Sequence, residues 1–442
     1  YAMSSQIEIA NEKLNAAYER LVDEEDARVC KDISEAACHY VPVNFFTIIA
    51  ANTLSKLGDE LANPKTVLAW LFTFVAAPVW LVGFLVPIRE SGSMLPQLFI
   101  AAFVRRLAVR KWVWVLGSVL QGLAVFGLGA VAFSLQGAAA GWAIIGLLVV
   151  FSLARGLCSV AFKDVQGKTI PKTRRGRLSG LSASVSGLLA LAVGLYFLLQ
   201  QGEPGSPLFY ALLLTGAGLL WLGAALLFAQ VQEYPGASEG GGNAIRTALQ
   251  SLGLLRDDAP FRRFVTVRAL LLCSALTAPY YVLLASQQAE TGIATLGLFI
   301  VANGLASSLS APFWGRQADA SSKQVMIRAA LITAGLGIVM FLIETLLPVL
   351  TAGGWLYPVA FFVLGIAHSG VRLGRKTYVV DLAGGNKRTD YVAVSNTVIG
   401  LLLLATGLIG LLAAVMPPEG LILVLSLLGL AGALLGTRLP EA

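Results

Sequence analysis

The chain has few charged residues and almost no histidine. Asp, Glu, Lys and Arg make up 13% of its 442 residues, and only two histidines are present. Soluble globular domains contain about 25% charged residues, so a water-soluble fold is excluded. The four cysteines, Cys30, Cys38, Cys158 and Cys273, are too few and too scattered for a disulfide framework. Cys30, Cys38 and His39 lack a fourth ligand, so we expect reduced thiols and no bound metal.

The sequence also lacks the motifs of common catalytic sites. It contains no phosphate-binding loop of the form Gly-x-x-x-x-Gly-Lys-Ser/Thr, no metalloprotease histidine pair and no serine nucleophile elbow. We therefore expect a protein that is not an enzyme and uses no cofactor. Any energy for work must then come from an ion or solute gradient.

Apolar residues dominate the chain instead. Hydrophobic residues make up 57% of it, and the mean hydropathy is +0.76. The 46 glycines suit helices that pack closely in lipid. Apolar stretches of the length that spans a bilayer, about 20 residues, follow one another from residue 41 onward. The sequence predicts an all-α polytopic membrane protein with twelve transmembrane helices.

The segment from Val41 to Val104 must contain two crossings, and it can be divided in two ways. In the first division, one helix runs from about residue 43 to 76, bent around Asp59 to Pro64, and the next from about 79 to 104. The second division places the crossings at about 41 to 62 and 66 to 88. Only the first puts Arg89 and Glu90 within the membrane.

The positions of Lys and Arg predict the orientation, because short cytoplasmic loops retain positive charge. With the N-terminus inside, every inner loop is basic, and the outer loops carry no Lys or Arg in the first division and only Lys65 in the second. Both termini are therefore expected in the cytoplasm, in a bacterial-type inner membrane. The pI of about 9.3 then reflects loops that face anionic lipid, and we expect no nucleic-acid partner.

Four regions are expected. Residues 1–40 form an acidic cytoplasmic extension with an amphipathic helix, 41–231 a six-helix bundle, 232–263 a cytoplasmic linker, and 264–442 a second six-helix bundle. An internal repeat supports this division: Arg155 precedes Asp164 by nine residues, and Arg372 precedes Asp381 by the same spacing, 217 residues later. The two bundles are therefore expected to be pseudo-symmetric.

Short motifs resemble those of the major facilitator superfamily. Residues 311–319, Ala-Pro-Phe-Trp-Gly-Arg-Gln-Ala-Asp, followed by Lys323, resemble its loop signature, and residues 101–106 form a degraded first copy in which Arg105 stands where an Asp is expected. Gly58-Asp59 resembles a pair in the first span of some exporters, and Arg155-Gly156 partly resembles the arginine motif of proton-coupled drug exporters. The resemblance implies a monomeric transporter whose two halves rock about a central site.

Charged residues within spans are costly, about 2.5 to 3.5 kcal/mol each on insertion scales, so they are candidates for a substrate or proton cavity. Our candidates are Asp59, Arg89, Glu90, Arg155 and His368. Asp59 is the preferred proton carrier; alternatively it pairs with Lys56 or Arg89 and only holds helices together. Arg155 is a candidate clamp for an anion, and His368 is either a proton relay or a packing residue.

A second group of residues is expected to gate the cytoplasmic side, with ion pairs that form in one access state and break in the other. The candidates are Arg105, Arg106, Asp164, Gly315, Arg316, Asp319, Arg372 and Asp381. The alternative is that they only fix loops and topology.

The favoured function is a secondary transporter that exports a small organic or amphipathic solute with protons as coupling ion. The first alternative is an importer of an anionic metabolite or chelate, favoured if Arg89, Arg155 and Arg372 converge on one cavity. The second is a lipid flippase or a non-transporting membrane sensor, favoured by a lateral opening or a cavity without ionisable groups.

Overall fold

The computed structural model describes residues 17–19, 35–104, 106–171, 174–200, 205–236, 253–288, 292–382 and 388–441. Within these residues every regular element is a helix. Of the expected amphipathic helix of the extension only residues 17–19 are described, and they are helical. Half of the linker, residues 237–252, lies outside the described residues. Cys38 is disulfide-bonded, so the expectation of a reduced thiol is wrong there.

The first half of the chain contains the elements α2 to α10. They are α2 (Glu35–Cys38), α3 (Val41–Leu61), α4 (Val67–Phe74), η2 (Val79–Phe84), α5 (Leu85–Met94), α6 (Gln97–Val104), α7 (Lys111–Ser134), α8 (Gly137–Thr169), α9 (Arg175–Leu198) and α10 (Pro207–Ala229).

The second half contains the elements α12 to α20. They are α12 (Leu254–Asp257), α13 (Ala259–Leu270), α14 (Cys273–Leu276), α15 (Ala278–Ser286), α16 (Ile293–Ala320), α17 (Ser322–Leu346), η4 (Pro348–Leu350), α18 (Leu356–Leu382), α19 (Arg388–Thr406), η6 (Gly407–Ala414) and α20 (Pro418–Thr437).

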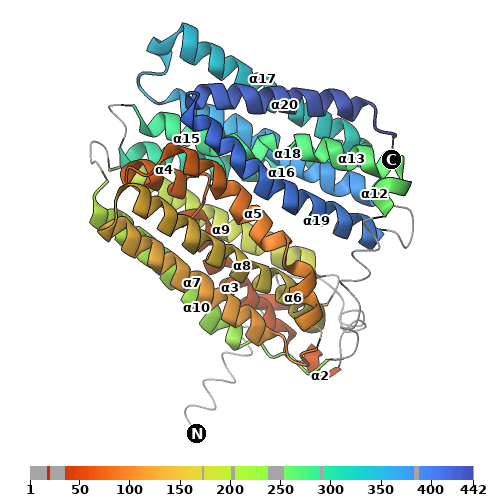
Figure 1. Ribbon diagram of the computed structural model, residues 1–442. Coiled ribbons are helices and arrows are strands. Elements are labelled where there is room, and N and C mark those ends of the chain that lie inside the picture. Colours follow the sequence, from red (N-terminus) through yellow and green to blue (C-terminus); the bar gives the residue numbers. More distant parts are fainter. Residues whose placement is uncertain are drawn as a thin grey trace.

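Most helices pack against helices of their own half. In the first half α7 packs against α8 and α10, and α3 against α9 and α10; in the second, α17 packs against α18 and α20, and α16 against α18. Figure 1 shows the two groups side by side, the first half in red to yellow-green and the second in green to blue. This arrangement matches two bundles joined along one face.

Ten helices within the described residues are long and apolar enough to cross a membrane. The first two expected crossings are broken into shorter pieces, which follow the first of the two divisions. Proline explains both breaks: α3 ends before Pro64, and Pro96 separates α5 from α6, because proline lacks the backbone N–H that continues a helix. Together with the ten continuous helices, these two broken crossings fit the twelve expected spans.

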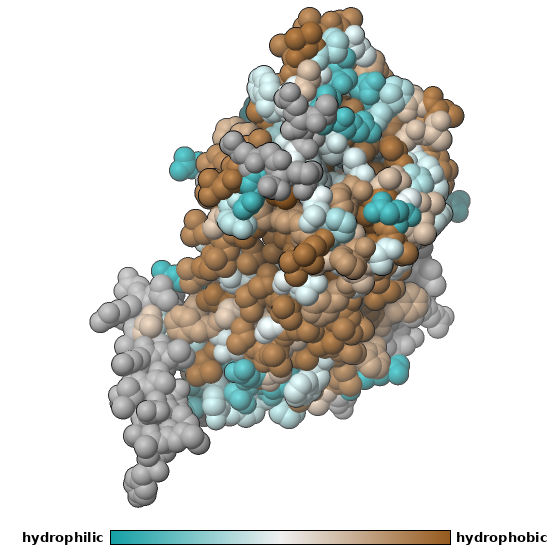
Figure 2. All heavy atoms as spheres, turned by 90° about the vertical axis from the view of Figure 1, so that its left-hand side faces the viewer, coloured by the Kyte–Doolittle hydropathy of each residue, from teal (hydrophilic) through white to brown (hydrophobic). Residues whose placement is uncertain are grey.

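The outer surface of the bundle is apolar, as lipid requires. Large exposed hydrophobic side chains are spread over many helices, for example Leu188, Leu226, Leu346 and Leu434. Figure 2 shows brown, hydrophobic residues over most of the face that it presents. The chain is therefore a multi-pass integral membrane protein.

The segments that connect the helices alternate between two ends of the molecule. One end, here called the basic end, carries the Lys- and Arg-rich connections, for example Arg106 to Lys111 between α6 and α7. Both α2 and the C-terminus lie at this end (Figure 1), and Lys323 at the start of α17 binds Glu441, with its Nζ 2.9 Å from Oε1. This placement fits the expectation that both termini lie on the same side of the membrane.

Candidate functional site

A cavity of about 390 Å³ lies between the two halves. Its walls come from α3, α5, α8 and the bend at 62–66 in the first half, and from the link at 271–272, α14 to α16, α18 and α19 in the second. Nine of its 26 lining residues are charged, six cations and three anions. The cations are Lys65, Arg89, Arg155, Arg372, Arg375 and Lys376, and the anions are Asp59, Glu60 and Glu90.

Asp59 holds two arginines on the wall formed by the first half. The Nη2 atom of Arg89 on α5 lies 2.7 Å from Oδ1 of Asp59, and Nη1 of Arg155 on α8 forms an ion pair with Oδ2. The guanidinium of Arg89 also lies over the ring of Phe151, 4.9 Å from its centroid. One carboxylate thus joins three helices and has Arg89 as one of its partners. The choice between a proton carrier and a purely structural pair stays a prediction.

Glu60, the next residue, connects the halves. Its Oε2 accepts a hydrogen bond from Nδ2 of Asn303 on α16 at 2.7 Å and another from Nδ2 of Asn63 at 3.4 Å. Adjacent helical residues point about 100° apart, so Asp59 can serve its own half while Glu60 reaches across the interface.

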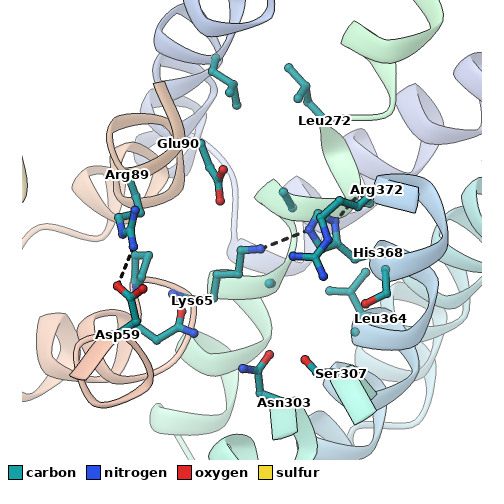
Figure 3. Close-up of a pocket in the computed structure, with 18 of the residues that line it drawn as sticks. Asp59, Lys65, Arg89, Glu90, Leu272, Asn303, Ser307, Leu364, His368 and Arg372 are labelled. Atoms are coloured by element: carbon teal, nitrogen blue, oxygen red, sulfur yellow. Dashed lines mark hydrogen bonds and ion pairs between the residues drawn. The ribbon is translucent and has the colours of Figure 1, made fainter. Parts of the chain in front are cut away.

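A second polar bridge joins the halves at the bend between α3 and α4. Lys65 extends across the cavity toward α18, where its Nζ lies 3.4 Å from Nε2 of His368 (Figure 3). The other ring nitrogen, Nδ1, lies 3.0 Å from Oγ of Ser274. A protonated Lys65 is a donor only, so Nε2 must accept and Nδ1 must carry the proton that is donated to Ser274.

The remaining charges are arranged unevenly. Arg372, Arg375 and Lys376 all come from α18 on the opposite wall, and Arg372 lies beside His368 in Figure 3. Glu90 on α5 points into the space near Lys65. Within the described residues, no ion pair with a carboxylate is found for any of the three α18 cations.

The cavity is closed at the end opposite the basic one. There η2 packs against η6 so closely that a Cβ on Gly83 would lie 2.4 Å from Cα of Gly410, so two glycines are required at this crossing. The hydroxyls of Thr73 and Ser286, from opposite halves, are 2.8 Å apart. The other extensive contacts between the halves are those of α9 with α16 and of α5 with α19.

At the basic end the charged contacts of the described residues stay within one half. Arg110 binds Asp164 at 3.1 Å, Lys168 binds Glu233 at 2.8 Å, and Ser322 donates to Asp381 at 3.2 Å. The two halves are therefore packed together at the end with η2 and η6, where the cavity is sealed. They are less tightly joined at the basic end.

The structure places the predicted gate residues as follows. Asp164 and Asp381 lie at the basic end and contact their own halves, while Arg106 is exposed and Gly315 faces open space. Arg316 has no ion pair within the described residues, and Arg372 lines the cavity. Arg105 and the side chain of Asp319 lie outside the described part of the chain. A gating role for these residues stays a prediction.

All five predicted cavity residues, Asp59, Arg89, Glu90, Arg155 and His368, line the same cavity. Arg155 and Arg372, the paired arginines of the repeat, line it from α8 and α18, the equivalent helices of the two halves. Several further lining residues were not among the candidates predicted from the sequence: Glu60, Lys65, Asn303, Arg375 and Lys376. A usable signal existed for Arg375, which follows Arg372 by three positions and so lies on the same helix face.

Within the described residues no group of three or more His, Cys, Asp or Glu side chains is placed to hold a metal ion. The chemistry of the site therefore has to be inferred from its charged side chains and from the cavity between them. The cations of the cavity can bind a charged solute, and its carboxylates can take up and release protons. Both events can change the contacts between the halves.

No protein-family model matches the chain. Among curated proteins it is similar to uncharacterized proteins of Mycobacterium tuberculosis strain H37Rv and Mycobacterium bovis, with 23% identity, covering 80% of this chain and 69% of each relative.

Solved structures show the same fold. A D-xylose-proton symporter superposes with a TM-score of 0.67 at 15% identity, covering 90% of this chain and 98% of the symporter. The nucleoside transporter NupG gives 0.66 at 12% identity, covering 90% and 98%. A POT family transporter in complex with 5-aminolevulinic acid gives 0.64 at 10% identity, covering 89% and 95%. The chain therefore has the fold of the major facilitator superfamily.

Proposed function

We propose that the protein is a secondary transporter that moves a small organic solute across a bacterial-type inner membrane by alternating access, as a monomer and without chemical conversion of the solute. The observation that carries this proposal is the charged cavity between two helical bundles, sealed at one end. The proteins with similar structures include transporters of xylose, of nucleosides and of the POT family, which supports transport as the general activity.

Protons are the proposed coupling ion. Asp59 and Glu60 place two carboxylates side by side at the cavity, one held by arginines and the other by Asn303 across the interface. If Asp59 released its arginines and took up a proton, the contacts within the first half would loosen. If Glu60 took up a proton, its contact with Asn303 across the interface would weaken, and the halves would separate more easily. Both changes would couple proton binding to the access state.

Export is the proposed direction, on the resemblance of Gly58-Asp59 and Arg155-Gly156 to exporter motifs. Uptake of an anionic solute is the second candidate, because Arg89, Arg155 and Arg372 do converge on one cavity. A flippase or sensor built around an apolar cavity is disfavoured by the nine charged side chains that line this one.

Transport can be tested with the full chain in proteoliposomes that contain a pH-sensitive dye. Sugars, nucleosides, amino acids and organic acids are added one at a time, with the pH gradient imposed in either direction. We expect at least one solute to move protons together with itself, and Asp59→Asn and Glu60→Gln to reduce this coupled movement by about tenfold or more.

Asp257→Asn is the matched control, because Asp257 lies exposed on α12, outside the cavity lining. It should leave proton movement unchanged. Proteoliposomes that behave like empty liposomes with every solute would contradict the transport function. A solute driven equally in the wild type, Asp59→Asn and Glu60→Gln would contradict the coupling role of the two carboxylates.

A further inference from the structure

The cations of the cavity fall into two groups that differ in how their charge is compensated. Arg89 and Arg155 share the carboxylate of Asp59. The second group, here called the cation cluster, consists of Lys65, Arg372 and Arg375. Lys65 comes from the first half, and the two arginines are one helical turn apart on α18 of the second half.

The cation cluster has little to neutralise it. Lys65 contacts the ring nitrogen of His368, which carries no negative charge. Within the described residues, neither Arg372 nor Arg375 forms an ion pair, and the Nε of Arg375 is buried without a hydrogen-bond partner. Glu90 interacts with Lys65 and Arg375, and Glu60 interacts with Lys65, so two carboxylates face three cations, and both also have other partners.

A further cation lies behind the cluster. Arg268 on α13 is 6% exposed and donates to Oγ of Ser395 at 2.5 Å and to Oδ1 of Asn396 at 2.8 Å, both neutral groups. Its charge acts on Arg375 and adds to the local excess. Arg268 is buried, Lys65 and Arg375 are half-buried, and Arg372 is exposed. Cations with too few counter-ions are unfavourable within a membrane protein, so this wall of the cavity favours an anion.

We propose that the transported solute carries a carboxylate or phosphate group that binds Lys65, Arg372 and Arg375. This inference rests on the proposed transport function and adds the substrate class and the residues that select it. The guanidinium group presents donors in a planar fork that matches both kinds of anion, and Lys65 supplies a point charge from the facing half.

The position of the cluster gives the anion a second effect. Because Lys65 belongs to one half and the arginines to the other, an anion between them replaces repulsion across the interface with attraction to both sides. Its binding then favours states in which the halves lie closer together around the solute. Arg89 and Arg155 have no such role while Asp59 holds them.

The test measures ligand-dependent thermal stability of the purified full chain in detergent. The probes are inorganic phosphate, glucose 6-phosphate and succinate, with glucose and dimethyl succinate as neutral counterparts. We expect at least one anion to raise the melting temperature while its neutral counterpart does not. If only the phosphate compounds raise the melting temperature, the site recognises a phosphate group. If only succinate raises it, the site recognises a carboxylate.

Lys65→Gln, Arg372→Gln and Arg375→Gln should each raise the concentration of that anion needed for half-maximal stabilisation by about tenfold, because each removes a charge-assisted hydrogen bond. Without ligand these variants should melt no lower than the wild type, since each removal relieves repulsion between cations. Arg375→Lys keeps the charge and should retain part of the response. Arg328→Gln is the control, because Arg328 is exposed on α17 and bonds only to Gln317 within the described residues.

The inference is overturned if no anionic probe stabilises the wild type, if neutral counterparts act equally, or if all three Gln variants respond as the wild type does. These outcomes are separate from failure of the transport function. A neutral solute transported equally by the wild type and Arg375→Gln would leave transport intact and refute the anion site. Anion binding without movement of any solute in proteoliposomes would support the site and refute transport.

Discussion

Asp59 is a single carboxylate between two guanidinium groups, and this position makes it important for stability. Asp59→Asn would leave Arg89 and Arg155 together without the carboxylate that pairs with both, and only the more distant charge of Glu90 would remain to offset theirs. Breaking a fully buried pair costs about 3 to 5 kcal/mol. Because the side chain of Asp59 is 19% exposed to the cavity, we expect a smaller loss of about 2 kcal/mol, seen as a lower melting temperature of the purified protein.

A second substitution separates charge imbalance from the loss of a packed side chain. In Asp59→Asn combined with Arg155→Gln, only Arg89 remains charged in this group, so part of the lost stability should return. Equal melting temperatures for the wild type and Asp59→Asn would show that the two ion pairs contribute nothing to folding. A double variant less stable than Asp59→Asn would contradict the explanation by charge imbalance.

The residues of the site were predictable where a charge interrupts an apolar run. Asp59, Arg89, Glu90, Arg155 and His368 stand out in this way, because each must find a partner or a cavity within lipid. Their pairing was not predictable, because Asp59 precedes Arg155 by 96 positions and only the packing of α3 against its neighbours decides the contact.

Three of the missed residues lie near connections, where charge has an ordinary explanation. Lys65 follows Pro64 at the break between α3 and α4, and Arg375 and Lys376 belong to a basic run near the end of α18. Such positions are expected for loops that fix topology. The structure gives them another role, because the bend turns Lys65 into the cavity and α18 continues to Leu382.

Among the helices, the first two crossings were the least certain from sequence, and their breaks explain why. The segment from Val41 to Val104 contains Lys56, Asp59 and Glu60, and its hydropathy allows two divisions into crossings equally well. Pro64 interrupts the helix, and the charged side chains beside it need polar partners within the membrane. Both facts favour one bent first crossing. The ten continuous helices needed no such argument.

The crossing of η2 and η6 is the tightest contact between the halves, and it depends on glycine. Gly83→Val would place side-chain atoms where the backbone of Gly410 lies. Overpacking of this kind costs about 1 to 3 kcal/mol, so the population should shift by about tenfold or more toward states in which this end is open. We expect faster labelling of Ser286→Cys by a membrane-impermeant maleimide added to that side.

Gly146→Val is the control for this substitution. Gly146 lies exposed on α8, and an added Cβ meets no atom within 4 Å, so labelling of Ser286→Cys should not change. The free thiols of Cys158 and Cys273 are buried and should react slowly in both proteins. Unchanged labelling in Gly83→Val would mean that this crossing does not hold the end closed.

For the whole molecule, the distribution of contacts between the halves defines one access state. The end with η2 and η6 is held by close packing and by the hydroxyl pair of Thr73 and Ser286, whereas charged contacts at the basic end stay within each half. Alternating access requires the opposite arrangement to form during the cycle. Asp164 and Asp381, now bonded within their own halves, are then available to residues across the interface.

Locking the sealed end tests this cycle directly. The hydroxyl oxygens of Thr73 and Ser286 are 2.8 Å apart, so two cysteines at these positions can approach to disulfide distance. Oxidation of Thr73→Cys with Ser286→Cys should stop solute movement in proteoliposomes, and a reductant should restore it. Anion-dependent stabilisation should survive oxidation, because the cation cluster stays accessible from the basic end. Each single cysteine variant should be insensitive to oxidation, and full transport by the oxidised double variant would show that this end need not open.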